Sequence, residues 1–343
     1  MSKQTKILII YTGGTIGMVE DKETGALYPF DFEALTQQIP EIKKFKFEID
    51  SFSFDPLLDS SNMTTQDWIK IAEVIEMNYE KYDGFVVLHG SDTMSYTASA
   101  LSFMLENLNK PVIFTGSQLP IGVLRTDGKE NFITAIEIAA ANINGRPIVP
   151  EVAIYFENQL FRGNRTHKFN AENFEAFQSI NYPVLAEAGV HIKYNSTAIL
   201  PFPKKKFTVY KEMNTSIAVL KLFPGIQKEV VESIISIKGL KAIVLETFGS
   251  GNAPNVPWFL DLVRTAIKNG IIIYNVTQCR GGSVEIGRYD TSIDMGKIGV
   301  VGGFDITIES AIAKLMFLLG KNYTKKQIWK LLQTSIRGEL TVA

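Results

Sequence analysis

The first apolar run of the chain, Ile7-Leu8-Ile9-Ile10-Tyr11, leads directly into Thr12-Gly13-Gly14-Thr15-Ile16-Gly17. A short continuous apolar run that glycines stop is typical of a strand buried on both faces of a parallel sheet. The paired glycines let the backbone turn sharply and approach a ligand with no Cβ in the way. We therefore expect a central strand at residues 7–11, followed by a loop that lies at a binding edge.

Strands and helices alternate after this first run. Apolar runs predict strands at residues 85–88, 112–115 and 152–156, and a 3.6-residue period predicts helices from about residue 65 and at 93–108 and 131–141. This alternation indicates βαβ units, whose right-handed crossovers place helices on both faces of a mostly parallel sheet. Residues 45–54 alternate apolar with polar side chains, which predicts an edge strand with one solvated face.

A second βα series begins near residue 217 and ends in two helices. The predicted fold class is therefore α/β with two domains: a larger N-terminal domain with a mostly parallel sheet at residues 1–193 and a smaller C-terminal α/β domain at 215–343. Residues 194–214 have few helix signals and contain Pro201-Phe202-Pro203 followed by three lysines, which favours a linker. Capping boxes are predicted at Thr64 with Asp67 and at Thr324 with Gln327.

Composition narrows the class of protein. The 343 residues include 35 basic and 36 acidic side chains, so the net charge of −1 provides no overall field to attract nucleic acid or an anionic membrane. No apolar run is long enough to cross a bilayer or to form the core of a signal peptide. The single cysteine cannot close an intramolecular disulfide, which fits a reducing compartment. We expect a cytoplasmic protein that binds neither nucleic acid nor membranes.

Polar clusters follow the predicted strands, where α/β sheets bind ligands. Besides the glycine loop, they are Asp59-Ser60-Ser61-Asn62, His89-Gly90-Ser91-Asp92-Thr93 and Thr115-Gly116-Ser117-Gln118. The order Gly-Gly-x-x-Gly differs from the dinucleotide fingerprint, so nucleotide binding and a tight strand-exit turn both stay open as interpretations of the glycine loop. The additional hydroxyl-rich clusters favour a catalytic site.

Hydroxyls, carboxylates and a lysine suit nucleophilic attack by a hydroxyl group on an amide or ester. The hydroxyl needs a base, and a buried lysine can serve when desolvation or a cationic neighbour lowers its pKa. The run from Arg162 to Lys168 offers such a lysine, although a solvated loop would have the same composition. His89 fits a structural histidine or a triad base. His167, His191 and Cys279 show no metal-ligand spacing, so we expect no metal.

Two signatures identify a resemblance to bacterial-type L-asparaginases, in particular their intracellular type I branch: Tyr11-Thr12-Gly13-Gly14-Thr15-Ile16-Gly17-Met18 and Leu88-His89-Gly90-Ser91-Asp92-Thr93-Met94. Supporting stretches are Asp59–Ser61, Thr115–Gln118, Arg162–Lys168, Gly251–Pro254, Thr277–Cys279 and Arg337–Thr341. They extend over nearly the whole chain in the order of the family. The resemblance implies hydrolysis of L-asparagine to L-aspartate and ammonia without metal or cofactor.

The resemblance also implies roles for individual residues. Thr15 is similar to the nucleophile that forms an acyl-enzyme, and Tyr28 to the mobile tyrosine that helps to deprotonate it. Ser91, Asp92 and Lys168 resemble the constellation that activates water, and Asp92 also receives the α-ammonium group of the substrate. The remaining matches concern substrate binding: Asp59, Ser60 and Ser61 at the α-amino and α-carboxylate groups, and the backbone around Ser117 at the amide.

Two positions depart from the family pattern. Threonine usually stands where this chain has Ser91, and serine keeps the hydroxyl but is freer at χ1, so we expect reduced or altered turnover. Some type I enzymes bind asparagine at an effector site that includes a cysteine matching Cys279 and a segment matching Glu246-Thr247-Phe248. The first residue of that segment is arginine in the known version, so Glu246 reverses its charge. Cys279 also fits a small apolar residue at a strand end.

Other family properties concern assembly and relatives with different functions. The resemblance implies a homodimer or homotetramer in which Asn252 completes the site of a neighbouring subunit. Glutamine differs from asparagine by one methylene, and a pocket discriminates against one methylene by only about 1–3 kcal/mol, so weak glutamine hydrolysis stays open. Two alternatives are a related amidotransferase subunit that supplies ammonia to a tRNA-bound substrate, which normally carries an additional N-terminal domain, and a non-enzymatic amino-acid sensor.

Overall fold

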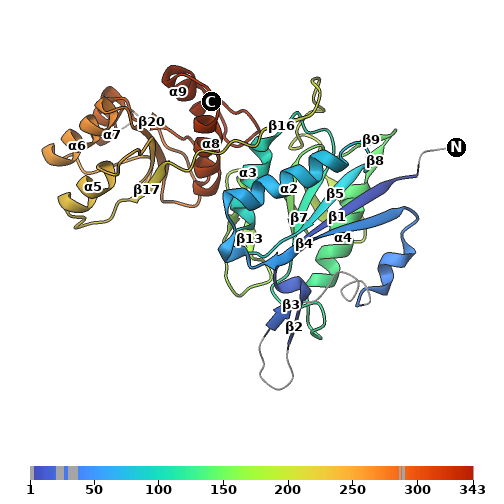
Figure 1. Cartoon of the computed structure of the whole chain (residues 1–343). Coiled ribbons are helices and arrows are strands. Elements are labelled where there is room, and N and C mark those ends of the chain that lie inside the picture. Colours follow the sequence, from blue (N-terminus) through green and yellow to red (C-terminus); the bar gives the residue numbers. More distant parts are fainter. Residues whose placement is uncertain (1–3, 21–26, 30–37, 286, 288–289, 343) are drawn as a thin grey trace. The chain divides into compact units, whose positions relative to one another are not determined.

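A computed structural model of the chain describes residues 4–20, 27–29, 38–285, 287 and 290–342. The chain divides into two compact units, Met1–Lys211 and Glu212–Ala343 (Figure 1). The segment expected as a linker, residues 194–214, contains the short strand β16 (Thr208–Val209), which belongs to the first unit. The domain limits at residues 193 and 215 stay predictions.

The first unit is built on one large sheet. Its strands are β1 (Lys6–Gly13), β4 (Glu48–Leu58), β5 (Gly84–Leu88), β7 (Val112–Thr115), β10 (Val152–Phe156), β11 (Gln159–Arg162), β14 (Ala186–Ala188) and β15 (Ile192–Tyr194). The strand order is β15-β14-β11-β10-β7-β5-β1-β4. The strands from β10 to β4 pair in parallel, whereas β11, β14 and β15 pair antiparallel. This confirms the mostly parallel sheet and places the half-solvated strand β4 at its edge.

Helices cover both faces of this sheet, as the βαβ pattern predicts. Phe132 and Ile136 of α4 (Gly128–Ala140) pack with alternate residues of β1 and β5. On the other face, Phe85 of β5 stacks on Tyr79, which follows α2 (Thr65–Asn78). The predicted capping box of α2 is confirmed, because the backbone N–H of Thr64 donates to Oδ2 of Asp67 at 2.8 Å. The central strands are therefore buried on both sides, which explains their continuous apolar sequence.

The helix expected at residues 93–108 is shorter in the structure. Helix α3 (Met94–Met104) ends where β6 (Leu105–Glu106) pairs antiparallel with β16. A strand partner from a distant part of the chain thus overrides the local helical pattern. The remaining short elements of the unit are β2 (Met18–Glu20), β3 (Leu27–Pro29), β8 (Asn142–Ile143), β9 (Arg146–Pro147), β12 (His167–Lys168), β13 (Phe177–Gln178) and the 3₁₀ helices η1 (Thr15–Gly17), η2 (Pro40–Lys44), η3 (Ser60–Asn62) and η4 (Gly163–Arg165).

The second unit is a smaller α/β domain, as expected. Its parallel sheet has the order β17 (Ile217–Lys221), β18 (Ala242–Thr247), β19 (Ile272–Thr277) and β20 (Val301–Gly302). Its helices are α5 (Lys228–Ile235), α6 (Pro257–Lys268), α7 (Asp290–Ile298), α8 (Ile308–Gly320) and α9 (Lys325–Leu332). Phe259 and Val263 of α6 pack with Ile243 and Leu245 of β18, and α8 contacts the same sheet. No helix within the described residues has the length and apolar character needed to span a membrane.

Candidate active site

Four neighbouring parallel strands bring the predicted polar clusters to one edge of the large sheet. The strands β4, β1, β5 and β7 lie side by side in that order. The clusters that follow them are Asp59–Asn62, Thr12–Gly17, His89–Thr93 and Thr115–Gln118. Because the carboxyl ends of parallel strands meet at the same edge, segments far apart in the sequence share one site.

The loops after β1 and β5 touch through their backbones. Gly14 has φ of 95°, and a Cβ on it would lie 2.5 Å from the amide nitrogen of Gly90. Oγ1 of Thr12 donates a hydrogen bond of 2.8 Å to the carbonyl of Leu88. Thr15, the predicted nucleophile, is half-buried and begins η1 one residue beyond this contact. Its place relative to the His89–Thr93 loop is therefore set by backbone contact.

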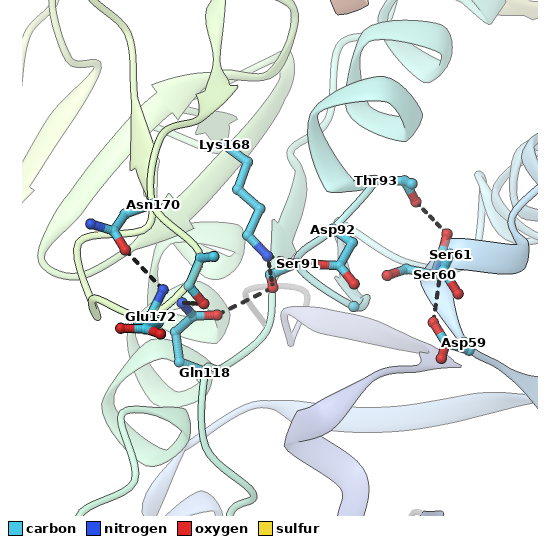
Figure 2. A network of polar contacts seen from close by, with 12 residues as sticks. Asp59, Ser60, Ser61, Ser91, Asp92, Thr93, Gln118, Lys168, Asn170 and Glu172 are labelled. Carbon is cyan, nitrogen blue, oxygen red and sulfur yellow. Dashed lines mark hydrogen bonds and ion pairs between the residues drawn. The ribbon is translucent and has the colours of Figure 1, made fainter.

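Ser91, Lys168 and Asp92 form a connected group (Figure 2). Nζ of Lys168 donates to Oγ of Ser91 at 2.9 Å and lies 2.6 Å from Oδ1 of Asp92. The Lys168 side chain is 18% exposed and that of Asp92 is 63% exposed, so the ion pair is partly open to solvent. Lys168 comes from β12, so the sequence places it far from Ser91 although the fold brings them into contact. The structure thus unites the three residues that the resemblance grouped.

The cluster after β4 joins the same site. Oδ1 of Asp59 accepts a hydrogen bond of 2.8 Å from the backbone N–H of Ser61, and Oγ1 of Thr93 donates to the carbonyl of Ser60 at 2.7 Å (Figure 2). Ser60 is buried, and a Cβ on Gly90 would lie only 2.5 Å from its hydroxyl oxygen. Thr93 had no predicted role, yet it is the residue that ties the Asp59–Ser61 cluster to the Ser91 loop.

Ser117 and Gln118 follow β7. The buried Ser117 hydroxyl donates to the carbonyl of Leu119 at 2.5 Å, so its side chain is engaged with its own loop. The backbone N–H of Gln118 is held by both carboxylate oxygens of Asp127, at 2.9 and 3.1 Å. Burial raises the pKa of the Asp127 carboxyl, and the N–H groups of Gln118 and Leu119 oppose that rise. Gln118 lies in one of the polar clusters recognised in the sequence, but nothing in the sequence indicates a function for it.

The Gln118 side chain connects two parts of the site. Its Oε1 accepts a hydrogen bond of 3.3 Å from Oγ of Ser91, and its Nε2 donates to the carbonyls of Ala171 and Asn173 at 3.1 and 3.0 Å. Neither the spacing of Gln118 nor its neighbours in sequence indicates these contacts. They depend on the tertiary placement of the segment that follows Lys168.

His89 is fully buried at the end of β5 and next to this site. Its Nδ1 lies 2.7 Å from the carbonyl of Gly90, which makes Nδ1 the protonated nitrogen of a neutral ring. Among the described residues Nε2 has no hydrogen-bond partner. Burial lowers the pKa of His89 to about 4. These features favour the structural interpretation of His89 over that of a triad base.

The other predicted residues are placed less completely. Tyr28 lies on β3 opposite Val19 of β2, but its side chain is outside the described part of the chain. In the second unit, Asn252 and Phe248 exchange backbone hydrogen bonds of 2.8 and 2.9 Å. Glu246, Thr247 and Phe248 come at the end of β18, and the exposed Cys279 follows the paired strand β19. The predicted effector residues thus occupy adjacent strand ends.

The described residues contain no group of three or more His, Cys, Asp or Glu side chains that could hold a metal ion. The groups that the site itself offers are hydroxyls, carboxylates, amides and an ammonium. A carboxylate together with backbone and hydroxyl donors suits a zwitterionic ligand, because each buried charge needs a partner.

Comparison with known proteins agrees with this fold. The model of the family "Asparaginase, N-terminal" matches residues 6–200, and that of "Glutaminase/Asparaginase C-terminal domain" matches residues 216–332. The chain belongs to the asparaginase family. The resemblance drawn from the sequence signatures is thereby confirmed.

Individual relatives cover almost all of the chain. It is 42% identical to L-asparaginase 1 of Escherichia coli K12 over 99% of both chains. The crystal structure of L-asparaginase I from Vibrio cholerae superposes with a TM-score of 0.90 at 41% identity, over 99% of this chain and 100% of that one. The chain is also 40% identical to the mouse 60 kDa lysophospholipase, covering 100% of this chain and 64% of that protein.

Proposed function

We propose that this protein hydrolyses the side-chain amide of L-asparagine to give L-aspartate and ammonia. The observation that carries the proposal is the contact of Lys168 with Ser91 and Asp92 beside the Gly14–Thr15 loop, in a chain of the asparaginase family. A hydroxyl nucleophile, a second hydroxyl bonded to an amine, and a carboxylate are the groups that amide hydrolysis through a covalent intermediate requires.

The reaction proceeds in two balanced steps. Oγ1 of Thr15 bonds to the amide carbon of the substrate, the C–N bond breaks, and the proton of Thr15 leaves with the nitrogen as ammonia. Water then attacks the ester, the bond to Thr15 breaks, and Thr15 regains a proton. Tyr28 assists the removal of the proton from Thr15 in the first step. The Ser91–Lys168 pair accepts the proton of water in the second step.

The α-ammonium and α-carboxylate groups of the substrate are bound by a second set of residues. Asp92 and Asp59 pair with the α-ammonium group, and Ser60 and Ser61 donate to the α-carboxylate. The backbone around Ser117 holds the reacting amide. No metal and no cofactor take part in this scheme. The finer assignments, namely the type I class, a cytoplasmic location and a homodimer or homotetramer to which Asn252 contributes, stay predictions.

The decisive test replaces the nucleophile. Thr15→Ala should lower the rate of ammonia release from asparagine by at least about 1,000-fold, because the removal of a nucleophile abolishes the covalent route. Thr265→Ala, which changes an exposed threonine on α6 of the second unit, is the matched control and should retain the wild-type rate. Equal rates for wild type and Thr15→Ala would show that Thr15 is not the nucleophile.

The same assay separates the proposal from its alternatives. A wild-type protein that binds asparagine but releases no ammonia would indicate an amino-acid sensor. Ammonia release that depends on a tRNA-bound acceptor would indicate an amidotransferase subunit. Measurement of kcat/KM for asparagine and for glutamine ranks the two amides, and we expect asparagine to be preferred.

A further inference from the structure

The orientation of the Gln118 side-chain amide is determined by its neighbours. Its nitrogen lies 3.1 Å from the carbonyl oxygen of Ala171 and 3.0 Å from that of Asn173. The reverse orientation would place an acceptor oxygen against two other acceptors, which cannot share a proton. Nε2 therefore faces the carbonyls of Ala171 and Asn173, and Oε1 faces Ser91 (Figure 2).

Ser91 is consequently held from two sides. An amide oxygen is only an acceptor, so the Ser91 hydroxyl donates its proton to Oε1 of Gln118 at 3.3 Å. Its oxygen in turn accepts from Nζ of Lys168 at 2.9 Å. The two contacts together select one side-chain rotamer of Ser91 and keep its oxygen within hydrogen-bond distance of Lys168.

This double contact matters because Ser91 is a serine. Threonine is restricted at χ1 by its branched Cβ, whereas serine rotates freely unless other groups hold it. We propose that Gln118 is a positioning residue, which holds the Ser91 hydroxyl in line with Lys168 and so replaces the constraint that a β-methyl group would supply. This inference rests on the proposed function of the Ser91–Lys168 pair.

Gln118 is itself anchored well enough for this task. Its backbone N–H is bound by both carboxylate oxygens of Asp127, and its Nε2 makes two hydrogen bonds. A residue whose backbone and side-chain amide are both already held loses little further conformational entropy when it orients a neighbour. The same contacts link the loop after β7 to the segment after Lys168.

The test is a double-mutant cycle that combines Gln118→Met with Ser91→Thr. Methionine has a similar length but offers no oxygen to accept the Ser91 proton. In the parent protein, Gln118→Met should lower kcat for asparagine by about 10-fold or more, since small displacements of reacting groups are costly. In the Ser91→Thr variant the same change should lower kcat by less than about threefold, because the threonine methyl then restricts χ1.

Asn170→Ala is the control for loss of loop structure alone. Oδ1 of Asn170 accepts from the backbone N–H groups of Glu172 and Asn173, so this change loosens the same segment without removing a contact of Ser91. It should leave kcat within about threefold of the starting value in both the parent protein and the Ser91→Thr variant. An equal loss of kcat from Gln118→Met in both proteins would overturn the inference. The same loss from Asn170→Ala would show that Gln118 acts only by holding the structure of the segment.

Failure of the inference and failure of the proposed function give different results. A wild-type protein that releases no ammonia from asparagine would overturn the proposed function itself. An active wild type whose Gln118→Met variant is as active as the parent, or is not rescued by Ser91→Thr, would overturn only the role of Gln118.

Discussion

Nζ of Lys314 lies 2.6 Å from Oε1 of Glu339, and both side chains are completely buried in the second unit. Lys314 also donates to the carbonyls of Leu332 and Thr334, and Glu339 accepts from the backbone N–H groups of Ile336 and Arg337. The ion pair therefore connects α8 to the segment that follows α9. Both charged groups have hydrogen-bond partners. Removal of one partner would leave the other as an uncompensated buried charge, which lowers the free energy of unfolding.

Glu339→Gln should destabilise the protein by about 3–5 kcal/mol, because it leaves the buried ammonium of Lys314 without its counter-charge. Chemical denaturation of the full chain measures the change. The double variant Lys314→Met with Glu339→Gln should regain part of the loss, since no buried charge then stands alone. A double variant that is as unstable as the sum of the two single changes would contradict this explanation.

Stability should fall between pH 6.5 and pH 4 because of His89. Its pKa in the folded protein is about 4, below the ordinary value of 6.5, so the unfolded chain binds a proton in this window that the folded chain does not. The stability that His89 contributes is present above pH 6.5 and is lost as the pH falls. We expect a loss of about 2 kcal/mol between pH 7.5 and pH 5.

Urea denaturation of wild type and His89→Gln at these two pH values checks this prediction. Glutamine does not titrate, so the variant should lose about 2 kcal/mol less than wild type over the same interval, whatever its absolute stability. An identical pH dependence in both proteins would show that His89 is not the group responsible.

Gly14→Ala should abolish activity and lower stability, because the new Cβ would lie 2.5 Å from the Gly90 amide nitrogen. Gly225→Ala is the matched control, since Gly225 has a similar φ of 88° but open space around its Cβ position. The control measures the cost of a Cβ at positive φ in open space, about 1 kcal/mol, and should retain activity. Similar losses in both variants would mean that conformation, and not the contact with Gly90, determines the effect.

Lys168→Met should lower kcat by about 100-fold or more, because the Ser91 hydroxyl loses the amine that assists proton transfer. Lys168→Arg discriminates between two roles of this lysine. Arginine keeps the positive charge beside Asp92 but does not release its proton, so it should be nearly as inactive as methionine. Substantial activity in Lys168→Arg, measured as ammonia release, would show that charge pairing with Asp92 is sufficient.

Saturation with asparagine should be hyperbolic. Glu246 is 14% exposed and its carboxylate faces Lys221 at 3.7 Å, so the residue at the predicted effector position is acidic and cannot supply a positive charge to the carboxylate of an amino acid. Cys279→Ala should leave the curve unchanged. A sigmoidal curve that becomes hyperbolic in Cys279→Ala would instead establish an effector site at these strand ends.

Local signals in the sequence predicted the framework well. The apolar run at residues 7–11 and the capping residue Thr64 each carry their structural information within a few neighbouring residues, and both are confirmed. The end of α3 could not be predicted in this way, because Leu105 leaves the helix to pair with Val209, which is distant in sequence. Local patterns do not contain such a partner.

The residues of the site likewise fall into those that local sequence patterns reveal and those that depend on tertiary contacts. The glycine loop and the Ser91–Asp92 loop follow strands that the sequence reveals, so their shared edge could be predicted from strand order alone. Lys168 could be assigned only through the family resemblance, since by composition its neighbours fit a solvated loop. The contacts of Gln118 depend on the placement of residues 171–173, which no short-range pattern specifies.

The backbone contact between Gly14 and Gly90 has a consequence for redesign of this protein. Two loops that meet through main-chain atoms leave no side chain to exchange, so the spacing between Thr15 and Ser91 is closed to gradual adjustment by mutation. The segment at residues 170–173 is instead joined to the site through the side chain of Gln118, and the Asn170 side chain holds the backbone of the segment itself, so both can be varied singly. Libraries that seek a new amide substrate should therefore vary this segment and keep the glycine loops constant.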